Sequence, residues 1–233
     1  MKKNKLKDVN NRRNFLRQVT ASAAVAGMGI LGSSVPVGAS PLQEIVHDDD
    51  DPESWLNQIK GKHRMVFDVI KPHQIFPFAW PRVFLITNEM TGTPEKENSA
   101  VVVLRHDAVP YALESKLWEK YKLGELFKAD DHLTKAPALR NPFWEPKPGD
   151  FKVPGLGPVQ IGINELQSSG VIFCVCEMAL TVYSAVAADM MKKDAAEVKK
   201  EWVAGILPGI NLVPSGVWAV GRAQEKGCGY CYV

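Results

Sequence analysis

The chain has 233 residues, of which 45% are hydrophobic and 23% are charged. These proportions are those of an ordinary globular protein, and they exclude an intrinsically disordered or fibrous chain. The 28 Lys and Arg residues nearly balance the 26 Asp and Glu residues, which excludes the strong basic excess typical of proteins that bind nucleic acid.

Residues 1–39 resemble a twin-arginine export signal. A basic head leads to Arg12 and Arg13, then to Phe15 and Leu16, and then to a mildly apolar, Ala- and Gly-rich stretch over residues 21–31. That stretch is shorter than the roughly 20 apolar residues needed to cross a bilayer, so we expect no permanent membrane span. The resemblance predicts passage through the twin-arginine export machinery, cleavage before Ser40, and a periplasmic or otherwise exported mature protein.

Removal of this signal changes the charge of the protein. The signal holds seven Lys and Arg residues and one Asp, so 21 basic and 25 acidic residues remain of the original 28 and 26, a net charge of −4. We therefore expect no nucleic-acid partner. Residues 40–60 are acidic at their start and are predicted to form a solvated linker. An exported location is oxidising, so the sequence leaves the redox state of the four cysteines open.

The remaining chain alternates between predicted strands and predicted helices. Short apolar runs predict strands at residues 64–70, 100–106, 171–175, 210–213 and 228–233. Helical patterns lie between them, and in the first helix Phe78, Val83, Leu85 and Ile86 are expected to form the apolar face. This alternation predicts an α/β fold with three layers, in which about five mostly parallel strands have helices on both faces. One domain over residues 61–233 accommodates it.

Residues 128–159 interrupt the alternation. They are rich in proline and show neither helical nor strand periodicity. We expect an inserted excursion over the surface, because long loops in compact domains are usually lids, interfaces or disordered segments.

Candidate chemistry lies at the carboxyl ends of the predicted strands, where ligands bind in such sheets. Cys176 ends one strand and immediately precedes a helix. The positive end of a helix dipole favours a thiolate, so Cys176 is the preferred nucleophile. His106 follows another strand at the same edge and is a candidate to stabilise the thiolate or to protonate a leaving group. The alternative for His106 is a structural role.

Cys174 lies two residues before Cys176, so both side chains are expected on the same face of the strand. A direct disulfide between them would be strained, because extended residues at this spacing are near the upper distance limit for a bridge. Cys174 is therefore either a small buried hydrophobe or a resolving thiol for Cys176.

Cys228 and Cys231 have two possible geometries. In a tight turn their sulfurs converge and can bridge or chelate a metal, whereas in a strand their side chains point to opposite faces. We favour the strand. A weaker alternative is that Cys174, Cys176, Cys228 and Cys231 together hold zinc or an iron–sulfur centre.

Several segments resemble the DsrE/DsrF-like family of sulfur-relay proteins. The segments are "GVIFCVCEMAL", "ILPGINLVPSG" and "WAVGRAQEKGCGYCYV", with looser agreement at "HRMVFDV" and "VVVLRHDAVPYAL". The likeness covers roughly residues 61–233, apart from the proline-rich insertion. It implies a flavodoxin-like three-layer sheet, assembly into homotrimers or hexamers, and a persulfide carrier at the position of Cys176 that exchanges sulfur with a donor or acceptor protein.

Three features depart from that family. The chain resembles an exported protein, the insertion is absent from short family members, and a simple carrier does not need Cys174, Cys228 and Cys231. Two other functions therefore stay open: a non-catalytic binding or structural oligomer module, and a protein with a Cys-ligated metal or redox cofactor.

Overall fold

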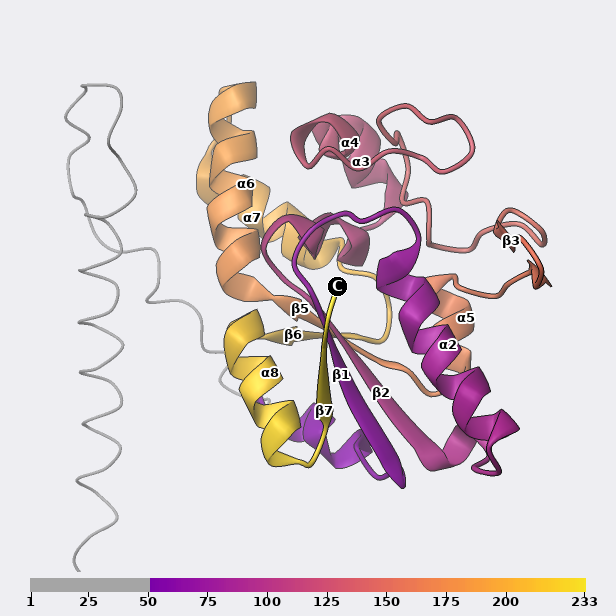
Figure 1. Ribbon diagram of the computed structural model, residues 1–233. Coiled ribbons are helices and arrows are strands. Elements are labelled where there is room, and N and C mark those ends of the chain that lie inside the picture. Colours follow the sequence, from indigo (N-terminus) through magenta and orange to yellow (C-terminus); the bar gives the residue numbers. More distant parts are fainter. Residues whose placement is uncertain (1–50) are drawn as a thin grey trace, which may run out of the picture. The chain divides into compact units, whose positions relative to one another are not determined.

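The computed structural model describes residues 51–233, so the predicted signal and the first part of the predicted linker lie outside the described residues. Five strands form one parallel sheet in the order β6-β5-β2-β1-β7 (Figure 1). The predicted α/β fold with a central parallel sheet is confirmed. The strands are β1 His63–Val69, β2 Asn98–Leu104, β5 Ile172–Cys176, β6 Ile210–Val213 and β7 Gly229–Tyr232.

Strand order follows chain order in one direction and then reverses. The chain runs from β1 through β2 and β5 to β6, and β7 then pairs with the free side of β1. All seven residues of β2 are buried, as expected for a strand covered on both faces. In sheets of this type the ligand crevice lies outside the carboxyl ends of the strands, at the point where the order reverses.

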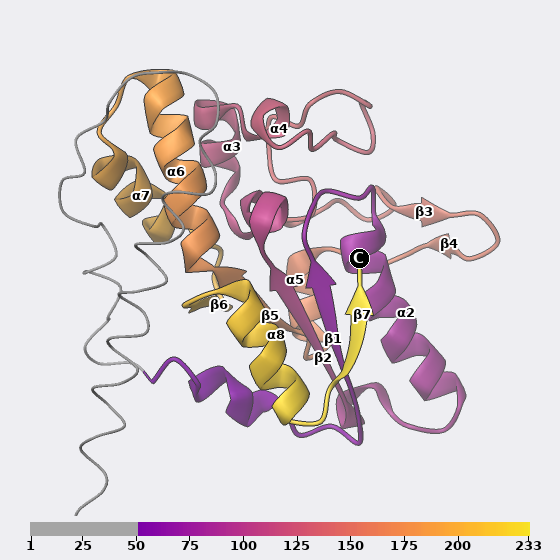
Figure 2. The same cartoon turned by 60° about the vertical axis from the view of Figure 1, so that its left-hand side comes forward.

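Helices cover both faces of the sheet. One face carries the first core cluster, with buried side chains of α2, α3, α5, α6 and α7, and the other carries the second cluster, with those of α8 and the 3-10 helix η2. The two views place α2 and α8 on opposite sides of the sheet (Figures 1 and 2). The helices are η2 Ser54–Gln58, α2 Phe76–Met90, η3 Glu95–Glu97, η4 His106–Ala112, α3 Ser115–Tyr121, α4 Leu123–Leu126, α5 Ile163–Ser168, α6 Glu177–Met191, α7 Ala195–Ala204 and α8 Gly216–Glu225.

Within residues 51–233, no helix combines the length and the hydropathy needed to cross a membrane.

The folded domain begins earlier than the sequence predicts. Trp55, Leu56 and Ile59 lie in the stretch predicted as a solvated linker, yet all three are buried in the second core cluster. The prediction failed because the acidic residues before them dominate the composition, whereas burial is decided by these three apolar side chains.

The predicted apolar face of α2 is partly wrong. Phe78 and Leu85 are buried, but Val83 and Ile86 are 38% and 42% exposed. Arg82 lies on the same face between these two buried residues. It follows Phe78 by four residues, and side chains four residues apart share a helix face.

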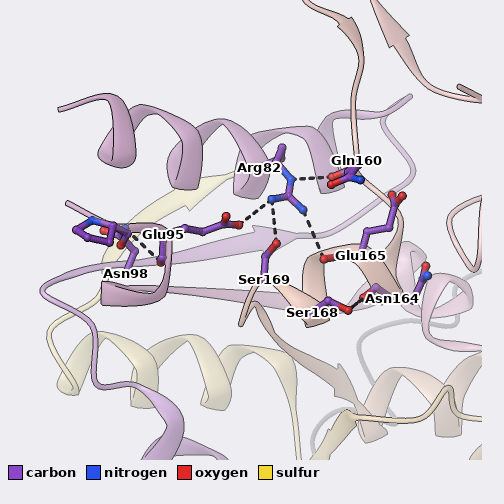
Figure 3. Close-up of polar contacts among 9 residues, drawn as sticks. Arg82, Glu95, Asn98, Gln160, Asn164, Glu165, Ser168 and Ser169 are labelled. Carbon is purple, nitrogen blue, oxygen red and sulfur yellow. Dashed lines mark hydrogen bonds and ion pairs between the residues drawn. The ribbon is translucent and has the colours of Figure 1, made fainter. Parts of the chain in front are cut away.

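Arg82 is stabilised in the interior by several acceptors. Its Nε donates to the carbonyl oxygen of Gln160 at 2.7 Å, and its Nη1 donates to Glu95 Oε1 at 2.8 Å and Ser169 Oγ at 3.0 Å (Figure 3). A buried guanidinium requires such partners. The arginine therefore connects α2 to the end of the insertion and to the end of α5.

The insertion at residues 128–159 is not simply a surface excursion. Phe143 and Phe151 are buried in the first core cluster, and their rings stack with centroids 5.0 Å apart. Asn141 is fully buried, donates to the carbonyl oxygens of Tyr111 and Leu113 at 2.8 and 2.9 Å, and accepts from the N–H of Phe143 at 3.1 Å. A small hairpin, β3 Lys152–Val153 with β4 Gly157–Pro158, projects from it (Figure 2).

Candidate thiol site at the carboxyl edge of the sheet

Cys176 is both the last residue of β5 and the N-cap of α6. Its Sγ accepts the backbone N–H of Ala179 at 3.3 Å, which satisfies one of the donors left free at the start of a helix. The side chain is 6% exposed. A sulfur in this position faces the positive end of a 15-residue helix, which stabilises negative charge there.

The backbone of Arg105 lies next to that of Cys176 at the same edge. The pairing of Leu104 with Val175 between β2 and β5 places the next residues of the two chains, Arg105 and Cys176, next to each other. The pKa of Arg105 is raised, first by its hydrogen bond to Asp68 and to a smaller degree by the charges of Tyr230 and Cys176. Asp68 is thus the main partner of Arg105, and the contribution of Cys176 is the smallest.

Asp68 of β1 holds the Arg105 guanidinium in a bidentate ion pair. Nε and Nη2 donate to the two carboxylate oxygens at 2.6 and 2.9 Å, and the Tyr230 hydroxyl of β7 donates to Asp68 Oδ2 at 2.8 Å. The Asp68 side chain is 3% exposed and that of Arg105 is 25% exposed. A planar guanidinium held by two parallel bonds has a defined orientation.

Gly216, the first residue of α8, packs against the stem of Arg105. A Cβ added at Gly216 would lie 2.4 Å from Arg105 Cβ and 2.7 Å from Cδ. The absence of a side chain at this position therefore lets the start of α8 approach the ion pair.

His106 is directed away from this arrangement. It begins η4 with a positive φ of 50°, and its Nδ1 lies 3.1 Å from Asp107 Oδ1 and 3.5 Å from the Tyr183 hydroxyl. The Tyr183 hydroxyl also donates to Asp107, and burial followed by this bond raises the pKa of Tyr183. Tyr183 lies seven residues beyond Cys176 on α6, about 10 Å along the helix axis. His106 thus belongs to a cluster with Asp107 and Tyr183, and the predicted partnership with Cys176 stays a prediction.

Cys174 is completely buried, and burial raises the pKa of its thiol. It lies in the second core cluster, whereas Cys176 lies in the first. The expectation that the two side chains share a face is therefore wrong, because the chain turns into α6 at Cys176 and the strand alternation ends there. The surroundings of Cys174 are those of a small hydrophobe.

Cys228 and Cys231 lie on opposite faces of the sheet, as predicted for a strand. Cys228 belongs to the second core cluster and Cys231 packs against the first. Strand β7 is separated from β5 by β1 and β2, a distance of about 14 Å at ordinary strand spacing.

The prediction of a metal site formed by all four cysteines is wrong, because β5 and β7 are too far apart. Cys174 and Cys176 on β5 cannot share a zinc or iron–sulfur centre with Cys228 and Cys231. All four cysteines are free, and among residues 51–233 no group of three His, Cys, Asp or Glu side chains is arranged to hold a metal ion.

Sequence reasoning missed Asp68, Arg105 and Tyr230. Two of them carried a signal: Asp68 interrupts an apolar strand, and Arg105 directly follows the run "VVVL". Because a charge in a buried strand needs a partner, two such residues of opposite sign on neighbouring strands indicate an ion pair. The contribution of Tyr230 depends on the pairing of β7 with β1.

No protein-family model matches this chain, and no curated protein sequence matches it.

Proposed function

We propose that this chain is an exported thiol protein of the DsrE/DsrF-like type that carries sulfur as a persulfide on Cys176. The observation that supports this most directly is the position of Cys176, which ends a parallel strand inside the sheet and caps α6. A nucleophilic thiol requires negative charge on sulfur, and the start of α6 stabilises such charge.

The proposed cycle has two displacement steps. The Cys176 thiolate attacks the outer sulfur of a donor, a sulfur–sulfur bond forms on Cys176, and the bond inside the donor breaks with its electron pair leaving on the donor fragment. An acceptor thiolate then attacks the outer sulfur of the Cys176 persulfide and regenerates the Cys176 thiolate. No external oxidant or reductant is needed.

The proposal is tested by incubating the purified protein with thiosulfate or with a persulfide donor. Mass spectrometry of the peptide containing Cys176 should show the mass of one added sulfur, and cyanolysis should release it as thiocyanate. Cys176→Ser is the matched control, because serine is a good helix N-cap and preserves the start of α6. Absence of the added sulfur on Cys176 in the wild-type protein would refute the proposal.

Export is proposed from the Arg12-Arg13 signal. Replacing both arginines with lysine should leave the unprocessed protein inside the cell, whereas the wild-type chain should be recovered from the exported fraction. Equal recovery of both proteins from that fraction would contradict a twin-arginine route.

Homo-oligomerisation is proposed from an exposed apolar stripe on α6. Met178, Val182, Val186 and Met190 follow one another at intervals of four residues and are 38%, 56%, 42% and 64% exposed. Side chains at this spacing share one face of a helix, and contiguous exposed apolar surface marks interaction sites.

The oligomer proposal predicts a trimer or a hexamer in light scattering. Val182→Lys should reduce the measured mass, while Val217→Lys, at a similarly exposed position on α8, should not. A monomeric wild-type protein would remove this proposal and would leave the one for Cys176 standing.

A further inference from the structure

We infer that the open edge of β7 binds the same edge of a second copy of this chain, so that two β7 strands pair antiparallel and a disulfide joins Cys231 to Cys231. This inference goes beyond the proposed function and does not use Cys176. It assigns a partner and a covalent site to a thiol that the proposed cycle leaves unused. The oxidising surroundings that favour such a bond follow from the proposed export, whereas the surface is argued from the strand itself.

Strand β7 has an open edge. It pairs with β1 on one side, and no strand of residues 51–233 pairs with its other side (Figure 2). Three of its four residues are exposed, whereas the strand at the opposite edge, β6, has no exposed residue. Proteins usually protect an open edge with lysine, proline or a bulge. The sequence of β7, "GYCY", has neither a charge nor a proline, and its pairing with β1 is regular.

The outer side of β7 carries backbone groups without a strand partner. The N–H of Val233 donates to the carbonyl oxygen of Asp68 at 3.0 Å. Because backbone groups alternate in direction along a strand, Cys231 also directs its N–H and C=O to β1, and Tyr230 and Tyr232 direct theirs outward. Within residues 51–233, the one contact printed for these outward groups is a long one, from Cys231 Sγ to the Tyr232 carbonyl oxygen at 3.8 Å.

Hydrogen bonding selects one register for two paired copies of β7. All outward groups of both strands are satisfied when Tyr230 of one copy lies opposite Tyr232 of the other. In that register Cys231 lies opposite Cys231 as a non-hydrogen-bonded pair, whose Cα atoms are about 4.5 Å apart in antiparallel sheets. This separation is within the range of disulfides, about 4.4–6.8 Å. The backbone therefore sets the register, and the register brings the two thiols together.

Exposed aromatic side chains lie on both faces beside this edge. Tyr230 and Tyr232 share one face and are 47% and 57% exposed. Helix α2 covers the other face, since Phe84 packs edge-to-face on Phe67, the β1 residue that pairs with the cysteine, at a ring distance of 6.1 Å. Trp80, one turn before Phe84 on α2, is 41% exposed.

The area available explains why a covalent bond is needed. The three exposed aromatic side chains offer about 300 Å² per copy, if each has a full area of about 150–250 Å². A stable interface buries roughly 800 Å² per partner. The strand contact alone is therefore weak, and the disulfide decides whether the pair of chains persists.

The bond forms by two thiol–disulfide exchanges with a disulfide oxidant, of which oxidised glutathione is the simplest. The Cys231 thiolate of one copy attacks the oxidant, forms a mixed disulfide and releases one glutathione thiolate. The Cys231 thiolate of the second copy then attacks the protein sulfur of the mixed disulfide and releases the second glutathione thiolate. Two cysteine thiols lose two electrons and two protons, and the oxidant takes them up.

The experiment oxidises the purified, reduced full chain in a glutathione buffer. The pH is mildly alkaline, because burial raises the pKa of the Cys231 thiol. Denaturing gels run without reductant measure the covalent dimer, so non-covalent assembly through α6 is not counted, and mass spectrometry identifies the linked cysteines. We expect a dimer joined at Cys231 that reductant removes, that Cys231→Ser abolishes and that Cys228→Ser retains.

A moved cysteine tests the register. The double variant Cys231→Ser with Tyr232→Cys places the thiol at a position that is 57% exposed in the wild type, so random collision would link it at least as readily. In the proposed register the two Cα atoms at position 232 are about 8 Å apart, which is beyond the reach of a disulfide. This variant should form the mixed disulfide with glutathione but roughly tenfold less dimer.

A proline tests the strand pairing. Tyr232→Pro removes an outward N–H, and proline is tolerated at an open edge. It should lower the share of dimer roughly tenfold relative to Tyr232→Ala, which keeps that N–H, because two hydrogen bonds are lost per dimer. Circular dichroism checks the folding of both variants.

Absence of a Cys231-linked dimer in the oxidised wild-type protein would overturn the inference, and so would equal dimer formation by the moved cysteine. The outcome is separate from that for sulfur transfer, because Cys231→Ser should load sulfur on Cys176 as the wild type does. A dimer without a persulfide on Cys176 leaves this inference standing and removes the proposed function, and the reverse result does the opposite.

Discussion

Substitution of the two glycines of α8 tests how tightly that helix packs on the Asp68–Arg105 pair. Gly216 and Gly221 lie in the same helix, but an added Cβ at Gly216 would lie 2.4 Å from Arg105 Cβ, whereas at Gly221 nothing lies within 4 Å. Replacing each glycine with alanine therefore makes the same chemical change with and without a steric conflict.

The two substitutions should change the free energy of unfolding in opposite directions. Gly221→Ala should stabilise the protein by about 0.5–1 kcal/mol, because alanine loses less backbone entropy in a helix. Gly216→Ala should destabilise it by about 1–3 kcal/mol, the usual cost of overpacking. The conflict cannot be relieved by a side-chain rotation, because the closest atom is the Cβ of Arg105 and moves only with the backbone.

Urea unfolding followed by circular dichroism measures both free energies. A Gly216→Ala protein as stable as the Gly221→Ala protein would show that α8 does not pack tightly against Arg105, and the prediction would be refuted.

Three further predictions concern the core and the surface. Asn141→Ala should cost about 2–3 kcal/mol in urea unfolding, because the buried Tyr111 carbonyl and Phe143 N–H lose their partner, while the Leu113 carbonyl keeps the Trp118 Nε1–H; an effect below about 1 kcal/mol would mean that the insertion is held in another way. Cys174→Ser should cost about 1–3 kcal/mol by burying a hydroxyl and should leave persulfide loading of Cys176 intact; loss of loading in a folded variant would restore a role for this thiol. Hydrogen bonds from Lys120 and then Tyr121 lower the pKa of Glu201 from its ordinary value of 4.5, so the stabilisation is present above that value and is lost as pH falls through the lowered pKa. The melting temperatures of wild type and Glu201→Gln should therefore differ at neutral pH and converge in acid, and a constant difference would contradict this.

The strands were predictable because each is a short run of apolar, mostly β-branched residues. The run "AVVVL" is all buried in β2, and the faces of Cys228 and Cys231 followed from simple alternation. These features depend on local sequence alone. The start of α8 also depends on local chemistry, because serine is a good N-cap and the Oγ of Ser215 accepts the N–H of Trp218 at 3.3 Å.

The packing of the insertion was not predictable from periodicity. Burial in residues 128–159 comes from separate side chains, such as Phe143, Phe151 and Asn141, that meet partners far away in the chain. Proline removes backbone donors and regular hydrogen bonding, so such a segment carries no repeating signal even where it enters the core.

The polar contacts at the carboxyl edge depend on strand order. Asp68, Arg105 and Tyr230 belong to three strands or their immediate ends, and they meet only because β1 lies between β2 and β7. The sequence of elements along the chain does not specify that β7 returns to β1. His106 shows a related limit, since its edge was predicted correctly but its direction depends on a left-handed backbone conformation at that residue.

The pairing of β7 with β1 affects when the thiol site is complete during biosynthesis. Tyr230 and Asp68 are 162 residues apart in the chain, and such distant contacts are formed late because the intervening loop must first be closed. Strands β1, β2, β5 and β6 can associate in the order in which they leave the ribosome, but β7 must find the first strand after all the others. A nascent chain therefore presents Cys176 and Arg105 before Tyr230 holds Asp68, and the finished charge arrangement marks a fully synthesised domain.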